Sequence, residues 1–96
     1  MTTQFRDVPS EHRFEEGFTD AEGETRAVFA DYAVQGETRV ILHVEADPNL
    51  RGAGAAGRFM QSLAEHARVE RLKLAPRCSY AVAWLKRHPE YRDVLA

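Results

Sequence analysis

The chain has 96 residues, with 13 lysines and arginines, 15 aspartates and glutamates, and a formal net charge of −2. This length fits one small domain, and contents of 44% apolar and 29% charged residues argue against a disordered chain or a coiled coil. No apolar run approaches the roughly 20 residues of a membrane span, and the N-terminus lacks the apolar stretch of a signal peptide. The single cysteine, Cys78, leaves no internal disulfide. We therefore expect a cytoplasmic monomer that does not interact with a membrane.

The charges are divided unevenly along the chain. Residues 1–50 carry 4 basic and 11 acidic side chains, net −7, and residues 51–96 carry 9 basic and 4 acidic side chains, net +5. The basic half is compatible with a small polyphosphate ligand, and the acidic half with a cationic one. The alternative is that the two halves attract each other in the fold. A nucleic-acid-binding domain is usually basic overall, so no nucleic-acid partner is expected.

The first half of the chain predicts a flexible arm followed by three strands. Residues 1–12 are polar, contain Pro9 and are predicted to form the arm, so the single domain covers residues 13–96. Strands are predicted at residues 14–18, 26–34 and 38–44, separated by a turn at 20–24 and a glycine-containing break at 35–37. In the third strand, alternation places one set of side chains on one face, Val40, Leu42 and Val44, and another set on the opposite face, Arg39, Ile41, His43 and Glu45.

The second half predicts two helices separated by a short strand. Apolar residues at helical spacing from Ala56 to Ala67 predict an amphipathic helix, residues 72–75 a strand, and residues 80–86 a second helix. Phe59 and Trp84 lie on apolar helical faces and are predicted core residues. The order β-β-β-α-β-α predicts an α/β (α+β) fold, with a mixed, mostly antiparallel sheet and two main helices.

A glycine-rich loop at residues 50–57 joins the third strand to the first helix. Gly52 and Gly54 lack Cβ atoms, so the chain can bend sharply and a ligand can approach its backbone closely. The unpaired N–H groups of the following helical turn favour phosphate. No Lys-Ser/Thr pair follows the second glycine, which excludes a P-loop, and the chain is too short for a dinucleotide-binding fold.

The segment Arg51-Gly52-Ala53-Gly54-Ala55-Ala56 resembles the Arg/Gln-x-x-Gly-x-Gly/Ala signature of the GNAT superfamily of N-acetyltransferases. The resemblance is closer to a small, single-domain YjdJ-type subfamily of acetyltransferase-like proteins, and it covers about residues 13–95. It also includes three further segments, His43-Val44, Pro76-Arg77-Cys78-Ser79-Tyr80 and Arg87-His88-Pro89-Glu90-Tyr91. It implies a minimal GNAT fold and an acetyl-CoA-dependent N-acetyltransferase whose amine acceptor, a protein or peptide among the candidates, is unknown.

The resemblance also implies where CoA binds. Backbone groups of Val44 and Glu45 would pair with the pantetheine arm, and backbone N–H groups of residues 51–56 would hold the pyrophosphate. Tyr80 and Arg87 are implied contacts to CoA. The implied cofactor-binding residues are Val44, Glu45, Arg51, Gly52, Ala53, Gly54, Ala55, Ala56, Tyr80 and Arg87.

The resemblance further implies a cysteine and a histidine near the acetyl group, which correspond to Cys78 and His43. A thiolate at a helix N-terminus is a good acyl acceptor, and the histidine would act as a base. Two alternatives stay open: Cys78 is a small buried apolar residue, and His43 has only a structural role. In the wider family a tyrosine protonates the departing CoA thiolate, and the corresponding position here is Leu85. The second function considered is therefore a CoA-binding regulatory or interaction module without turnover. The histidines and Cys78 lack zinc-like spacing, so no metal site is expected.

Overall fold

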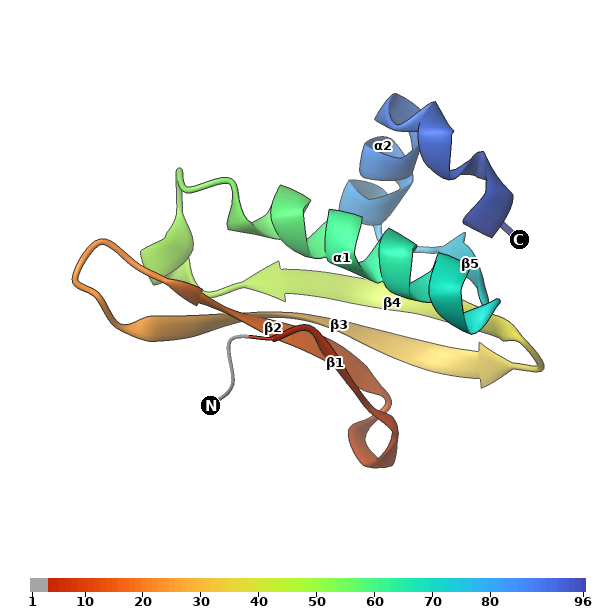
Figure 1. Cartoon of the computed structure of the whole chain (residues 1–96), viewed down its shortest axis with the longest axis horizontal. Helices are drawn as coiled ribbons and strands as arrows, with labels where there is room; N and C mark the ends of the chain where they lie inside the picture. The colour runs from red at the N-terminus through yellow and green to blue at the C-terminus, as the bar shows by residue number, and fades with distance from the viewer. Residues whose placement is uncertain (1–3) are drawn as a thin grey trace.

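A computed structural model describes residues 4–96 as one sheet with helices packed against it (Figure 1). The strands are β1 (Arg6–Val8), β2 (Arg13–Thr19), β3 (Thr25–Gln35), β4 (Thr38–Ala46) and β5 (Lys73–Pro76). The α-helices are α1 (Ala55–Glu70) and α2 (Ser79–Arg87), and the 3-10 helices are η1 (Pro9–Glu11), η2 (Pro48–Leu50) and η3 (Pro89–Val94). The predicted mixed fold and element order are confirmed, with an additional strand, β1, at the start.

The strands lie in the sheet in the order in which they occur in the chain. Strands β1 to β4 form an antiparallel meander, whereas β5 is parallel to β4. A parallel neighbour requires a crossover connection, and α1 supplies it. The pairing of β4 with β5 is short and ends at Ile41 opposite Pro76.

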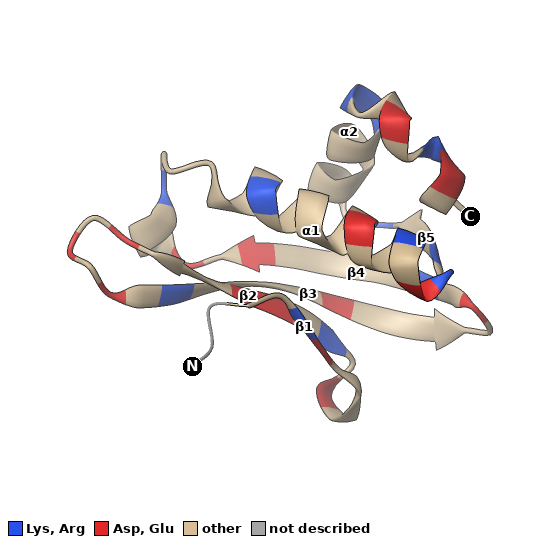
Figure 2. Cartoon of the chain, viewed as in Figure 1, with Lys and Arg blue, Asp and Glu red and all other residues tan. Residues whose placement is uncertain are grey.

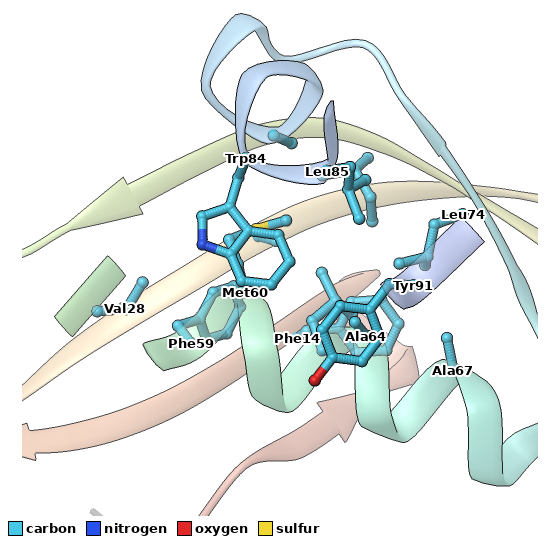
Figure 3. Packing of buried hydrophobic residues seen from close by; sticks show 14 of the residues in the cluster. Phe14, Val28, Phe59, Met60, Ala64, Ala67, Leu74, Trp84, Leu85 and Tyr91 are labelled. Atoms are coloured by element: carbon cyan, nitrogen blue, oxygen red, sulfur yellow. The ribbon is translucent and has the colours of Figure 1, made fainter. Parts of the chain in front are cut away.

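The helices gather on one face of the sheet and form one hydrophobic core with it. Helix α1 contacts strands β2 to β5, and both α2 and η3 contact α1. Phe59 is fully buried and Trp84 nearly so, which confirms both as core residues. Figure 3 shows side chains of α1, α2 and the strands gathered in this cluster. None of the described helices is long and apolar enough to span a membrane.

The prediction of a flexible arm over residues 1–12 is wrong for its second half. Residues 1–3 lie outside the described part of the chain, but β1 pairs with β2 along its whole length. The ring of Phe5 stacks on Phe14 at a centroid distance of 5.7 Å and lies 5.1 Å from the ring of His66. Partial burial of Phe5 and the pairing of β1 with β2 hold the segment on the domain. The polar composition of residues 1–12 gave no indication of either interaction.

The predicted division of β4 into two faces is also wrong, because the strand contains a β-bulge. Asp31 of β3 pairs with His43, but the next residue, Tyr32, pairs with Ile41, so Leu42 is an extra residue. Such an insertion reverses the alternation of side chains beyond it. Ile41 therefore lies in the core, whereas Leu42 is 50% exposed.

The ion pairs of the described residues do not join the acidic half of the chain to the basic half. They are Arg6–Glu15, Arg13–Asp31, Arg26–Asp20, His43–Glu45, Arg68–Glu65 and Arg68–Asp93, each within one half. Figure 2 shows both signs of charge on the strands and on the helices. Ion pairing between the halves therefore does not account for the uneven charge.

One acidic side chain, Glu16, lies on the helix-covered face of β2 and is expected to destabilise the fold at neutral pH. Its Oε1 atom is buried without a hydrogen-bond partner. Burial raises the pKa of the Glu16 carboxyl, although Ser62 and Arg58 act to lower it. The Glu16 carboxyl therefore keeps its proton to a higher pH in the folded state than in the unfolded state. The free energy of unfolding falls as the pH rises from the pKa of the unfolded chain to that of the folded chain.

We expect Glu16→Gln to raise the thermal midpoint at pH 7, and this gain to disappear below the ordinary pKa of glutamate. Thermal unfolding followed by circular dichroism across this pH range measures both effects. Glu37→Gln, at an exposed turn position, removes the same charge and serves as the control. Equal gains in the two variants would show that net charge, rather than burial of Glu16, is responsible.

Candidate functional site

A pocket of about 400 Å³ opens where the end of β4, the start of α1 and the start of α2 meet. Its wall combines the loop between β4 and α1 with the first residues of α1 and with Tyr80 of α2. The lining residues are Ala46, Asp47, Pro48, Leu50, Arg51, Gly52, Gly54, Ala55, Ala56, Gly57 and Tyr80. Six of these eleven residues are glycine or alanine, so a ligand can approach the main chain closely.

The conformation of the loop depends on the residues just before it and on two glycines within it. The Asp47 carboxylate accepts a hydrogen bond from the Asn49 backbone N–H at 2.8 Å, and Leu50 is buried, so η2 is fixed to the domain. Gly52 and Gly54 then adopt positive φ angles of 82° and 71°, a region that other residues occupy at a cost. Two sharp turns within three residues direct the chain into α1.

The N-terminus of α1 has the electrostatic character of an anion site. Its N-cap residue is Gly54, so no side chain accepts a hydrogen bond from the first-turn N–H groups, and no acidic residue lies in that turn. The first N–H groups of a helix lack partners within the helix and carry partial positive charge. Because these groups adjoin the pocket, it suits a phosphate or pyrophosphate group.

The pairing of β4 with β5 ends before β4 reaches this pocket. Beyond their last pair, the backbone N–H groups of Arg77 and Cys78 both donate to the Ile41 carbonyl oxygen, at 2.8 and 3.2 Å. In the part of the chain that the structure describes, β5 pairs with no residue of β4 after Ile41. Among the described residues, the β5 side of β4 near Val44 therefore has no paired strand, and an extended ligand can add to the sheet there.

Cys78 is half-buried at the N-cap of α2. Burial raises the pKa of the Cys78 thiol, but hydrogen bonds from the backbone N–H groups of Ala81, Val44 and Tyr80 outweigh it and hold the pKa below its ordinary value. Two of these donors belong to the first turn of α2, and the third crosses from β4. The same arrangement stabilises the thiolate, the nucleophilic form of cysteine.

The His43 side chain is exposed on the face of the sheet opposite the helices. Its Nε2 atom lies 3.0 Å from Oε1 of Glu45, and its ring centroid lies 6.3 Å from that of Phe29. The partner of the His43 ring is thus a carboxylate, whereas the Cys78 thiol is held by backbone amides. Neither set of interactions joins His43 to Cys78.

The remaining predicted residues lie on α2. Tyr80 lines the pocket, and burial raises the pKa of its hydroxyl, with Arg87 lowering it and Cys78 raising it further. Arg87 is exposed in the last turn of the helix. Leu85, at the position where the resemblance leads one to look for a tyrosine, is only 3% exposed and lies in the core.

The structure brings six predicted site residues into the pocket wall, namely Arg51, Gly52, Gly54, Ala55, Ala56 and Tyr80. His43, Val44, Glu45, Ala53, Cys78 and Arg87 are not part of that lining. Five lining residues are not among the predicted ones, namely Ala46, Asp47, Pro48, Leu50 and Gly57. The available sequence signal was Gly57, three residues after Gly54, although a Cβ there would make only ordinary contact with the Trp84 indole nitrogen, at 3.6 Å. No cluster of potential metal ligands occurs among residues 4–96.

Comparisons with known proteins agree with this geometry. Residues 14–94 match the family described as GCN5-related N-acetyl-transferase. Among solved structures, the fold is similar to the NMR solution structure of a GCN5-like protein from Staphylococcus aureus that is assigned as an N-acetyltransferase. The TM-score is 0.62 at 23% sequence identity, and the match covers 99% of this chain and 89% of the other. A search of curated proteins finds no significant match.

Proposed function

Since the chain belongs to the GCN5-related N-acetyltransferase family, a family of acyltransferases, we propose that it transfers the acetyl group of acetyl-CoA to an amine of a protein or peptide acceptor. The observation that carries this proposal is the pocket beside the uncapped N-terminus of α1. It offers backbone N–H groups to a pyrophosphate beside the part of β4 that lies beyond its pairing with β5. An extended thioester ligand needs both features.

In the proposed complex, backbone N–H groups of residues 52 and 54–56 hold the pyrophosphate, because those of Arg51 and Ala53 already donate to carbonyl oxygens of the loop. The open edge of β4 at Val44 and Glu45 pairs with the amide groups of the pantetheine arm, as an added strand would. Tyr80 of α2 contacts this arm from the wall of the pocket, and Arg87, in the last turn of the same helix, provides positive charge. The bound ligand supplies an activated acetyl thioester.

We assign the chemistry to Cys78 and His43. The Cys78 thiolate forms a bond to the acetyl carbon while the bond from that carbon to the CoA sulfur breaks, and the released thiolate takes a proton from solvent. The acceptor amine then forms an N–C bond while the bond to Cys78 breaks, and it gives one proton to His43. The lowered pKa of the Cys78 thiol supports the first step, and the exposed imidazole of His43 suits proton transfer.

A binding module without turnover is the second candidate, and Leu85 favours it. This side chain is buried at the position where the wider family has its tyrosine acid, so α2 provides no proton donor there for a departing thiolate. Both candidates require CoA binding, but only the enzyme forms an acetylated product.

Two measurements test the proposal. The first is isothermal titration calorimetry of the protein with acetyl-CoA, and the second is mass spectrometry of amine acceptors incubated with the protein and acetyl-CoA. We expect saturable one-site binding and an acceptor mass increase of one acetyl group. Absence of binding at millimolar acetyl-CoA would eliminate both candidates. Binding without product from lysine peptides, N-terminal amines or polyamines would favour the binding module.

A further inference from the structure

The face of the sheet opposite the helices carries polar side chains in two cross-strand rows. Residues Phe14, Val28, Ala30 and Tyr32 face the core, so the residues that alternate with them point to the other side. Strand register places Glu15, Phe29 and Glu45 in one row and Arg13, Asp31 and His43 in the next. These six residues, Arg13, Glu15, Phe29, Asp31, His43 and Glu45, are called the outer face below.

The charges of the outer face are neutralised unevenly. Arg6 of β1 pairs with Glu15, and Arg13 pairs with Asp31 at 3.0 Å, so two of the three carboxylates have a guanidinium partner. Glu45 has an imidazole partner instead, and its side chain is 59% exposed. Glu45 is therefore the carboxylate on this face that is available to a cation from solution.

The neighbouring aromatic ring already binds a cation on one side. The Arg13 guanidinium carbon lies 4.0 Å from the centroid of the Phe29 ring, within the range of a cation–π interaction. The His43 ring lies near the same Phe29 ring. A carboxylate with an aromatic ring beside it suits an ammonium group and the alkyl chain that carries it.

Glu45 also lies on the segment of β4 that adjoins the proposed acetyl-CoA site. This segment follows the last residue paired with β5. The next residue, Ala46, lines the pocket on the helix side. The segment therefore presents the pocket on one face and the Glu45 carboxylate on the other.

We propose that the outer face binds the acceptor as an extended, lysine-containing basic peptide, with the Glu45 carboxylate holding a lysine ammonium group beside His43. This inference rests on the proposed function. The exposed positions of Glu45 and His43 favour a peptide over a small amine, because small-molecule sites are concave and enclose most of their ligand. A peptide instead gains affinity from contacts distributed along its length.

Steady-state kinetics with the peptide acetyl-Gly-Lys-Gly-Lys-Gly-amide tests this proposal. Glu45→Gln should raise the KM for the peptide about tenfold, a typical effect of losing one charge-assisted contact of about 1.4 kcal/mol. The calorimetric affinity of Glu45→Gln for acetyl-CoA is measured in parallel, so that a loss of peptide binding is separated from a loss of acetyl-CoA binding. Glu37→Gln removes the same charge from an exposed turn between β3 and β4 and should leave both constants unchanged.

Two further measurements separate this inference from the proposed function. Titration of the ¹⁵N-labelled chain with the peptide, without acetyl-CoA, should shift the amide signals of Phe29, His43 and Glu45, and Glu45→Gln should weaken these shifts. Normal acetyl-CoA binding with an unchanged peptide KM in Glu45→Gln would overturn the inference alone. So would acetylation of spermidine with higher kcat/KM than that of the peptide. Failure of acetyl-CoA to bind would instead overturn the proposed function.

Discussion

Gly54→Val should weaken acetyl-CoA binding about 100-fold, or by about 2.8 kcal/mol since each tenfold change is about 1.4 kcal/mol. Gly54 has a φ angle of 71°, and it is the N-cap of α1. A β-branched residue disfavours this conformation, so the first turn and its free N–H groups would shift. The new side chain would also project into the pocket that Gly54 lines. Isothermal titration calorimetry with acetyl-CoA measures the loss.

The matched control for this variant is Gly23→Val. Gly23 has a φ angle of 82° in the turn between β2 and β3, and, as at Gly54, an added Cβ would meet nothing within 4 Å. Both substitutions place a branched residue in the left-handed region, which costs roughly 1–2 kcal/mol of stability. Thermal midpoints should therefore fall together, whereas only Gly54→Val should lose acetyl-CoA binding. Equal affinities in the two variants would refute the assignment of the loop.

The sequence predicts the anion-binding loop because its signals are local. Gly52 and Gly54 occur between a strand pattern and a helix pattern, and the helix that follows has an apolar face with regular spacing. Each of these features depends on residues a few positions apart. The same holds for the three-strand meander, whose turns contain Gly23 and Gly36 at positive φ angles.

Features that depend on distant residues were not predictable in this way. The bulge at Leu42 is invisible in the alternation of β4, because it arises from the register of β4 against β3. Strand β1 depends on the burial of Phe5 against Phe14 and His66. The sequence places Cys78 at a helix start, but only the fold brings the Val44 amide to its thiol.

Cys78→Ala should lower acetyl transfer on the order of 100-fold or more, as expected when the nucleophile of a two-step transfer is removed. Its acetyl-CoA affinity should stay near that of the parent chain, because the pyrophosphate loop and the open edge of β4 remain. Mass spectrometry of the parent chain after incubation with acetyl-CoA, without acceptor, should detect one acetyl group on Cys78. Turnover equal to that of the parent in Cys78→Ala would remove the covalent route while leaving direct attack by the amine.

The lowered pKa of the Cys78 thiol gives a test that requires neither acetyl-CoA nor an acceptor. The thiolate reacts with iodoacetamide, and Cys78 is the only cysteine, so alkylation reports on this residue. In the folded chain the rate should rise over a lower pH range than in the same chain unfolded in urea, which is the matched control. The folded state loses this proton first, so the free energy of unfolding should increase with pH between the two midpoints. Coincident pH profiles would show that the amides of Ala81, Val44 and Tyr80 do not stabilise the thiolate, and the nucleophilic role of Cys78 would lose its physical basis.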